Sequence, residues 1–396
     1  MLEPSRKWLS YLMMWLPALT APALILYLLH FEKEIRFFKK NALMYQQFVK
    51  ASFEAPGKSV SSFPMELRNL PLGEKTGIVI GTHSVTIKGV DSPYNASLLK
   101  KDKDTYHLFF RYDLVDENEW GGLAAYLGHV NLDRNFYQIG SEFTPLNTES
   151  SHAEDPRAFT VGSNILIEYN DLVKEPHFDG RMMHFAEFDP KKTDLKNIRP
   201  LDLRLRPIEK NWAPFEYVNE QGISQIYFAY TLSPLKIVKW SDDKKIVSNT
   251  DFSSYTRDID NMLWSKIWGS LRGGTPAQKV GDQYLAFFHS SFTDVNGIIW
   301  YCMGAYTFES HPPFRITGIS PYPILFEGMY DTPPTNTASP LKRVIFPAGF
   351  VVEDRDGKEV IQLSCGENDA GVKIVTLDKD ALLQSLMKIK RRKTNI

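Results

Sequence analysis

DPRAFTVGSNILIEYN, residues 155–170, has the layout of one β-hairpin: a start containing proline, an apolar strand, a polar turn and a strongly apolar second strand. Four other segments repeat this layout. They are NASLLKKDKDTYHLFFR (95–111), NWAPFEYVNEQGISQIYFAY (211–230), GGTPAQKVGDQYLAFFHS (273–290) and FPAGFVVEDRDGKEVIQLSCG (346–366). Successive starts at residues 95, 155, 211, 273 and 346 lie 60, 56, 62 and 73 residues apart.

This spacing leaves room for two more strands after each hairpin. The repeat therefore predicts five four-stranded blades, an all-β, five-bladed β-propeller over residues 66–380. Chance similarity among hairpins is the alternative, and five hairpins in register argue against it.

The N-terminus differs in kind from the rest of the chain. Trp8–His30 has 23 residues without Asp, Glu, Lys or Arg, enough for a membrane-spanning helix. We therefore expect a membrane anchor at 1–30, a cationic stem or linker at 31–65, and a C-terminal helix end with a basic tail at 381–396. A cleaved signal peptide is the alternative, because APA at 21–23 resembles a cleavage site. The cations that follow the span favour a cytoplasmic main domain, although short N-terminal tails often defy such counts and the side stays open.

Composition narrows the function. The formal net charge of −1 gives no indication of nucleic-acid binding. The two cysteines, Cys302 and Cys365, form no CxxC pair, which argues against a disulfide framework and a cysteine zinc site. His129, His152 and His184 share no ligand spacing, so we predict no metal and no cofactor.

In a propeller the inner strands line a central channel, and residues at the starts of those strands gather at one mouth of it. Residues far apart in sequence should then form one cluster, with one carboxylic acid among several cations. Its predicted members are Asn95, Asp155, Arg157, Lys210, Asn211, Trp212, Arg272 and the loop near Phe346, with Arg111, His289 and Asp369 at strand ends. EDPR (154–157) taken alone is typical of a surface turn, and the repeat register favours a site instead.

These motifs, in this order, resemble the five-bladed β-propeller superfamily of β-mannoside phosphorylases and hydrolases. The resemblance covers roughly residues 77–375 and rests on NASLL, EDPRAF, KNWAPF, RGGTPA and VIFPAGFV. EKNW (209–212) with LRGGT (271–275) is more similar to the related β-1,2-mannosyltransferases. The chain departs from the phosphorylase pattern at GGTPA and at SCG. Both departures fall at the expected substrate mouth, so the resemblance leaves linkage and acceptor specificity open.

The resemblance implies a role for each position. Asp155 would be the catalytic acid/base, and Arg111, Arg157, Lys210, Arg272 and His289 would bind phosphate or the leaving group. Asn95, Asn211 and Asp369 would bind the sugar, with Trp212 and Phe215 as aromatic candidates for its apolar face. Asn95 also heads the sequon NAS, which we interpret as incidental because a mannose-binding side chain is not a glycosylated one.

Three functions follow as expectations. The first is a membrane-anchored β-mannosyltransferase, which transfers mannose from GDP-mannose or mannose 1-phosphate to a glycan acceptor by an inverting single displacement. The second is a β-mannoside phosphorylase or hydrolase, whose phosphorolysis gives mannose 1-phosphate. The third is an inactive glycan-binding propeller, against which the retained acid and cations argue.

Overall fold

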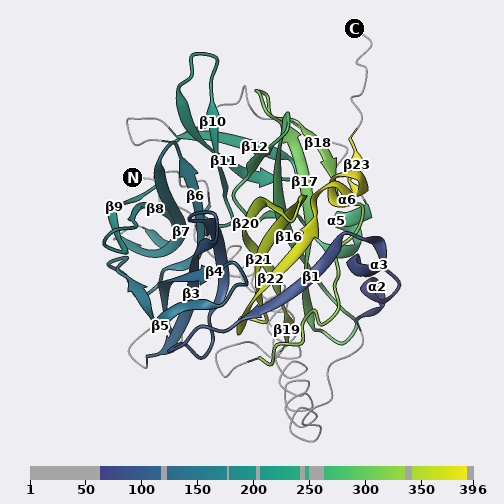
Figure 1. The fold of residues 1–396 in the computed structure, drawn as a ribbon, viewed down its shortest axis with the longest axis horizontal. Coiled ribbons are helices and arrows are strands. Elements are labelled where there is room, and N and C mark those ends of the chain that lie inside the picture. Colours follow the sequence, from purple (N-terminus) through teal and green to yellow (C-terminus); the bar gives the residue numbers. More distant parts are fainter. Residues whose placement is uncertain are drawn as a thin grey trace, which may run out of the picture. The chain divides into compact units, whose positions relative to one another are not determined.

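The computed structural model describes residues 63–116, 123–175, 178–201, 206–240, 246–248, 263–334 and 341–389, all within the compact unit Ser59–Ile396. Figure 1 labels the elements, and most of them are strands. The described helices are short: α2 (Met65–Arg68), α3 (Gly73–Thr76), α5 (Leu263–Trp268) and α6 (Lys379–Ser385). The all-β prediction is confirmed.

Three of the five sheets are four-stranded antiparallel meanders, each built from consecutive strands. The first contains β2 (Tyr94–Lys100), β3 (Thr105–Val115), β4 (Leu123–Asp133) and β5 (Gln138–Leu146). The second contains β6 (Glu154–Val161), β7 (Asn164–Glu175), β8 (Phe178–Asp189) and β9 (Asp194–Pro200). The third contains β10 (Ala213–Val218), β11 (Ser224–Leu232), β12 (Leu235–Trp240) and β13 (Ile246–Ser248).

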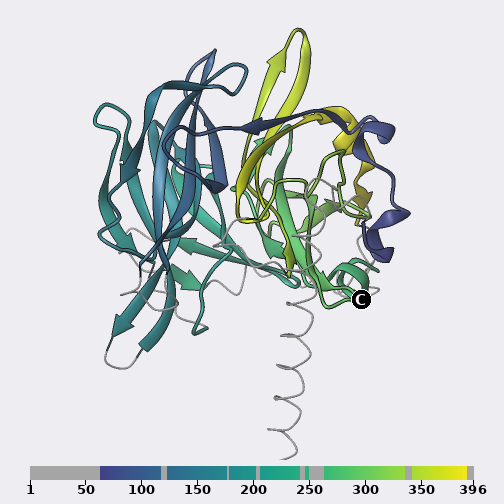
Figure 2. The ribbon, with the colours of Figure 1, turned by 90° about the horizontal axis from the view of Figure 1, so that it is seen from below.

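The last sheet joins the two ends of the described chain. Its order is β1-β22-β21-β20, formed by β20 (Ile345–Arg355), β21 (Lys358–Glu367), β22 (Gly371–Asp378) and β1 (Val79–Val85). Figures 1 and 2 both show the dark blue strand β1 beside the yellow strand β22, with which it pairs antiparallel. An N-terminal strand thus completes a C-terminal sheet, which ties the ring of sheets together.

The five sheets contact one another in a closed order, mainly through their inner strands. β20 contacts β2, β2 contacts β6, β6 contacts β10, β11 contacts β14 (Arg272–Gly273), and β16 (Gln283–Thr293) contacts β20. Inner strands such as β2 and β20 are buried over most of their length, as a packed channel wall requires. The arrangement is propeller-like, as predicted, and the two halves of each repeated hairpin pair antiparallel.

The remaining sheet departs from the predicted four strands. It has seven: β14, β16, β17 (Ile299–Glu309), β18 (Ile316–Ile319) and β23 (Met387–Lys388) in order, with β15 (Gln278–Val280) on β16 and β19 (Lys342–Arg343) on β17. Its inner strand is split in two because the amides of Gly274 and Thr275 both donate to the carbonyl of Phe287. Pro276 follows directly and has no amide hydrogen to continue the ladder. β23 extends the chain after α6, where a helix end was expected.

The prediction of a single-pass membrane protein is contradicted. Within the described ranges no helix has the length and apolar character of a membrane span, and α6, the longest of them, has seven residues. A spanning helix needs about 20 apolar residues. The predicted anchor Trp8–His30, most of the predicted stem and the basic tail lie outside the described residues.

Candidate active site

Three inner strands have a residue in the left-handed backbone region within two residues of their first position. Asn95, Asp155 and Asn211 have φ values of 46°, 57° and 64°. Side chains other than glycine adopt this region at a cost, and Asn and Asp tolerate it best. In β2 and β6 the strand register also shifts at this point, between Tyr94 and Ser97 and between Glu154 and Arg157. Backbone strain repeated at corresponding positions indicates a functional arrangement of these side chains.

These residues line one cavity of about 140 Å3 to which all five sheets or the segments leading into them contribute. Its lining is Asn95, Arg111, Glu154, Asp155, Lys210, Asn211, Arg272, His289, Tyr301, Lys342, Val344, Phe346 and Asp369. The structure therefore brings most of the predicted residues together at one mouth of the ring.

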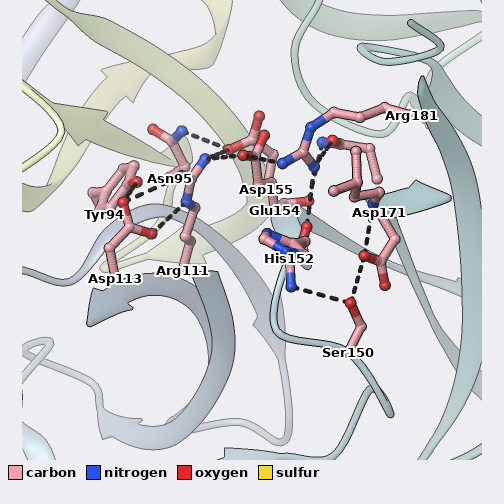
Figure 3. Close-up of polar contacts among 12 residues, drawn as sticks. Tyr94, Asn95, Arg111, Asp113, Ser150, His152, Glu154, Asp155, Asp171 and Arg181 are labelled. Carbon is pink, nitrogen blue, oxygen red and sulfur yellow. Dashed lines mark hydrogen bonds and ion pairs between the residues drawn. The ribbon is translucent and has the colours of Figure 1, made fainter. Parts of the chain in front are cut away.

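Asp155 is the most buried of the acids that line this cavity. Its side chain is buried, Asn95 Nδ2 donates to its Oδ1 over 2.7 Å, and Arg111 Nη1 lies 3.7 Å from the same oxygen (Figure 3). Burial alone would raise the pKa of Asp155. Arg111, Arg157, the hydrogen bond from Asn95 and Lys210 together hold that pKa below its ordinary value. Asp155 is therefore a carboxylate at neutral pH.

Arg111 was predicted to bind phosphate, but its donors are directed at carboxylates. Nε and Nη2 lie 2.9 and 3.2 Å from the two oxygens of Asp113, and Nη1 lies 3.3 Å from Glu154 Oε1. The ring of Tyr94 lies against the guanidinium, and the Tyr94 hydroxyl donates to Asp113 (Figure 3). Arg111 therefore fixes the acid side of the cavity.

Glu154, next to Asp155 in the sequence, is a second carboxylate of the cavity, and Arg181 contacts it in addition to Arg111. Arg181 Nη2 lies 2.5 Å from Glu154 Oε1, and Arg181 also donates to the carbonyl of His152 and to Asn170 Oδ1 (Figure 3). An arginine on each side keeps Glu154 in place, which distinguishes it from Asp155 although the two are neighbours in sequence.

The cavity also contains further cations, which are together called the cation side below. Lys210, Arg272 and Lys342 line it, and Arg272 Nη2 donates to Ser291 Oγ over 2.7 Å with its guanidinium over the ring of Tyr301. Arg272 Nε is buried without a hydrogen-bond partner among the described residues. Such an arrangement can accept an anion without displacing an existing carboxylate.

Two further titratable groups line the cavity. His289 is buried, and burial together with Arg272, Arg157 and Lys210 lowers its pKa far below its ordinary value, so the imidazole is neutral. Asp369, at φ 51°, has its pKa raised by burial, against Lys342 and Arg111. Asp155 and Asp369 thus share a cavity but have pKa values shifted in opposite directions, a pattern typical of acid–base sites.

Three predicted residues do not line the cavity. Arg157 is fully buried beneath it, with Nε donating to the carbonyl of Gly274 over 2.6 Å. Trp212 packs in the apolar core and donates to Glu209, and Phe215 packs among core aromatic rings. The interpretation of Trp212 and Phe215 as sugar-facing aromatics is therefore wrong, because both rings fill the space between sheets.

The structure also bears on the sequon at Asn95 and on the histidines considered as metal ligands. Asn95 is 6% exposed and bonded to Asp155, which agrees with an incidental sequon. His129 contacts His107 across 2.9 Å, and His184 Nδ1 lies 3.3 Å from the carbonyl of Met182. In the described part of the chain no cluster of His, Cys, Asp and Glu has the makings of a metal site.

Sequence reasoning missed Glu154, Tyr301 and Lys342 as lining residues. Glu154 directly precedes the predicted acid in the EDPR motif, so its place in the sequence could have indicated that it lines the cavity. Lys342 lies on the two-residue strand β19, which pairs parallel with β17, and no local pattern indicates such a strand.

A second and larger cavity, about 480 Å3, opens where the inner strands end. Leu99, Thr160, Val218, Lys279 and Val352 are among its lining residues. Glu216, which also lines it, accepts hydrogen bonds from the amide of Gly162 and from Ser224 Oγ. Asn95, Asp155 and Asn211, the residues with left-handed backbone, lie at the other mouth. Their position favours the smaller cavity as the active site.

No family model and no curated protein matches the chain. Among solved structures, a β-1,2-mannobiose phosphorylase from Listeria innocua matches with a TM-score of 0.51 and 14% identity, over 79% of this chain and 97% of that one. A structure from the GH130 family, described as mannoside phosphorylases and glycoside hydrolases that target β-1,2-mannosidic linkages in Candida mannan, matches with a TM-score of 0.51 and 13% identity, over 82% and 93%.

A GDP-Man-dependent mannosyltransferase from Leishmania mexicana also matches, with a TM-score of 0.45 and 16% identity, over 77% of this chain and 92% of that one. The solved structures that match thus include proteins of the superfamily that the motifs resemble. At these identities the similarity shows the fold alone.

Proposed function

We propose that the chain is a carbohydrate-active enzyme of β-mannosides, specifically a β-mannosyltransferase of the β-1,2 type that works by an inverting single displacement. The observation that carries this proposal is the convergence of Asp155 with Lys210, Arg272 and Lys342 in one cavity. In the same proposal the seven-stranded sheet counts as the fifth propeller blade, and its extra strand β19 supplies Lys342.

A single displacement requires one proton to move. The acceptor hydroxyl oxygen attacks the anomeric carbon of a mannosyl phosphate or nucleotide donor, and the bond from that carbon to the phosphate oxygen breaks. The electron pair leaves on the phosphate, and the hydroxyl proton passes to Asp155. Oδ1 accepts the hydrogen bond from Asn95, so we assign Oδ2 as the atom that takes the proton.

The cation side would hold the departing phosphate. In this proposal negative charge develops on the phosphate beside Lys210, Arg272 and Lys342, and fixed positive groups there stabilise the transition state. Neutral His289 adds a hydrogen-bonding ring without a further charge.

The lowered pKa of Asp155 supports transfer over cleavage. A carboxylate already ionised at neutral pH is prepared to accept a proton, as glycan synthesis requires. Asp369, whose burial raises its pKa, is suited to hold a sugar hydroxyl. Asn95 and Asn211 are the amide partners for the mannose ring.

A β-mannoside phosphorylase or hydrolase is the second candidate. Phosphate bound by the cation side would place negative charge near Asp155 and raise its pKa, which would let it protonate a departing glycosidic oxygen. The same cavity thus serves the reverse direction. An inactive glycan-binding propeller is the third candidate, and the strain retained at Asp155 argues against it.

The test uses the full chain with either GDP-mannose or mannose 1-phosphate and a panel of mannosyl acceptors, with products identified by mass spectrometry. Extension from GDP-mannose supports the transferase. Extension from mannose 1-phosphate that added phosphate reverses supports the phosphorylase, and release of mannose by water supports the hydrolase. Glycan binding without any turnover contradicts an enzymatic role.

A further inference from the structure

Arg157 connects the parts of the chain that build the cavity. Besides its bond to the carbonyl of Gly274, its Nη1 donates to the carbonyl of Asp155 over 3.3 Å and its Nη2 to Asn211 Oδ1 over 3.4 Å. The ring of Phe346 lies 5.6 Å from the guanidinium carbon. One buried side chain therefore contacts four of the five inner strand starts.

Glu168 lies directly opposite Arg157 in the β6–β7 pairing, and both side chains are fully buried. Its Oε2 is 4.0 Å from Arg157 Nη1, and neither carboxyl oxygen has a hydrogen-bond partner in the described ranges. Burial raises the pKa of Glu168 to about 8, with Arg157 opposing the shift. The two side chains are thus close enough to interact but form no hydrogen bond with each other. The Glu168 carboxyl group carries a proton at neutral pH.

The Glu168 carboxyl group and the acceptors of Asp155 and Asn211 compete for the N–H donors of Arg157. Its bonds to Asp155 and Asn211 are at the long end of the hydrogen-bond range, and Nη1 faces both the Asp155 carbonyl and Glu168. An ionised carboxylate attracts a guanidinium more strongly than a backbone carbonyl does. Deprotonation of Glu168 would therefore draw Arg157 away from the cavity.

We propose that Glu168 is a positioning residue that competes with Asp155 and Asn211 for the Arg157 guanidinium, so that ionisation of Glu168 loosens the strand starts that carry the acid/base. Arg157 is the charged group that faces Glu168 from β6. Phe185, opposite Glu168 on β8, is apolar. On its cavity side Arg157 faces the charge of Asp155 and the neutral ring of His289.

The structural test is independent of any activity. Crystal structures of the full chain are determined at about pH 6.5 and about pH 9.5, on either side of the pKa of Glu168. We expect the distance from Arg157 Nη1 to Glu168 Oε2 to shorten to about 2.8 Å at the higher pH, and the distance to Asn211 to lengthen. An unchanged Arg157 at both pH values overturns the proposal.

The kinetic test rests on the proposed function. Glu168→Gln keeps the shape of the side chain and removes its ionisation. We expect kcat/KM of the unsubstituted enzyme to fall about tenfold between pH 7.5 and 9.5, and the Glu168→Gln enzyme to keep its activity over that range. The matched control is Glu187→Gln on β8 of the same sheet, whose carboxylate pairs with Lys196 at the surface and should leave the profile unchanged.

An alkaline fall shared by Glu168→Gln and the unsubstituted enzyme overturns the proposal. If the full chain turns over no mannosyl donor, the proposed function fails, and the distances in the two crystals still decide whether Glu168 competes for Arg157. The same crystals decide the matter if Glu168→Gln does not fold.

Discussion

Asn95 Nδ2 lies 2.7 Å from Asp155 Oδ1, although the two residues are 60 positions apart and belong to different sheets. Both occupy the left-handed backbone region at the start of an inner strand, so the contact joins corresponding positions of two successive repeats. The ring of sheets thus converts a sequence repeat into a pair of side chains that meet across the cavity.

That contact predicts a change in pH dependence. In Asn95→Asp a second carboxylate replaces the amide donor, and two carboxylates at this distance cannot both ionise freely, so the pKa of Asp155 rises. Since Asp155 acts as a base in the proposed reaction, we expect the acid limb of kcat/KM to move up by about one pH unit or more. Asn219→Asp, in a surface turn where the side chain caps amides, should leave the limb in place.

The cation side predicts weaker binding of the phosphate-bearing substrate. Arg272→Gln and Lys342→Gln each remove one charged donor from the cavity, and each should raise the Kd for inorganic phosphate or a mannosyl phosphate by about tenfold or more. Lys279→Gln, in the cavity at the other mouth, is the control for a loss of net charge. Calorimetric titration that shows equal weakening in all three variants would argue against a local anion site.

Close packing between β2 and β21 predicts a sensitive glycine. A Cβ at Gly366 would meet Asn95 Oδ1 at 2.1 Å and the backbone of Asn95 at 2.5 Å, so Gly366→Ala should displace Asn95 and lower both Tm and kcat. Gly81→Ala in β1 meets Thr376 only at 3.8 Å and should change neither. Thermal unfolding and turnover of the two variants are compared side by side.

The buried pair His107 and His129 predicts a loss of stability in acid. Burial lowers the pKa of His107 to about 4 and that of His129 to about 3. The unfolded chain takes up protons at these rings below about pH 6.5, whereas the folded pair stays neutral. The pair thus favours the unfolded state as pH falls from about 6.5 towards 4, by about 1.4 kcal/mol per pH unit for each proton.

Urea unfolding over this range measures that slope. His129→Gln keeps a hydrogen-bonding partner for His107 and removes one titrating ring, so its slope should be shallower by about one proton. Equal slopes in the two proteins would show that His129 takes up its proton as readily in the folded protein as in the unfolded chain, which would contradict the prediction.

The sequence was sufficient for the hairpins but not for every side chain. Repeated apolar runs with polar turns located all five strand pairs, because strand burial leaves a regular pattern. The register shift between Glu154 and Arg157 breaks that pattern, so Arg157 turns below the cavity instead of sharing the direction of Asp155.

The position of Trp212 was likewise not predicted correctly from the sequence. It follows the left-handed Asn211 and packs in the core between sheets, a reversal that residue type does not reveal. Lys342 reaches the cavity from β19, whose parallel partner β17 is a long-range neighbour. Such placements depend on tertiary contacts, and a single sequence carries little record of them.

The most direct measurement compares Asp155→Asn with Glu154→Gln, two adjacent carboxylates that line the same cavity. Both full-length variants are assayed with GDP-mannose or mannose 1-phosphate and mannosyl acceptors, after thermal unfolding has shown that both are folded. We predict that Asp155→Asn loses kcat by about a hundredfold or more, and that Glu154→Gln, whose carboxylate is held by Arg111 and Arg181, loses far less. Equal activity of Asp155→Asn and the unsubstituted enzyme would contradict the assignment of Asp155 as the acid/base.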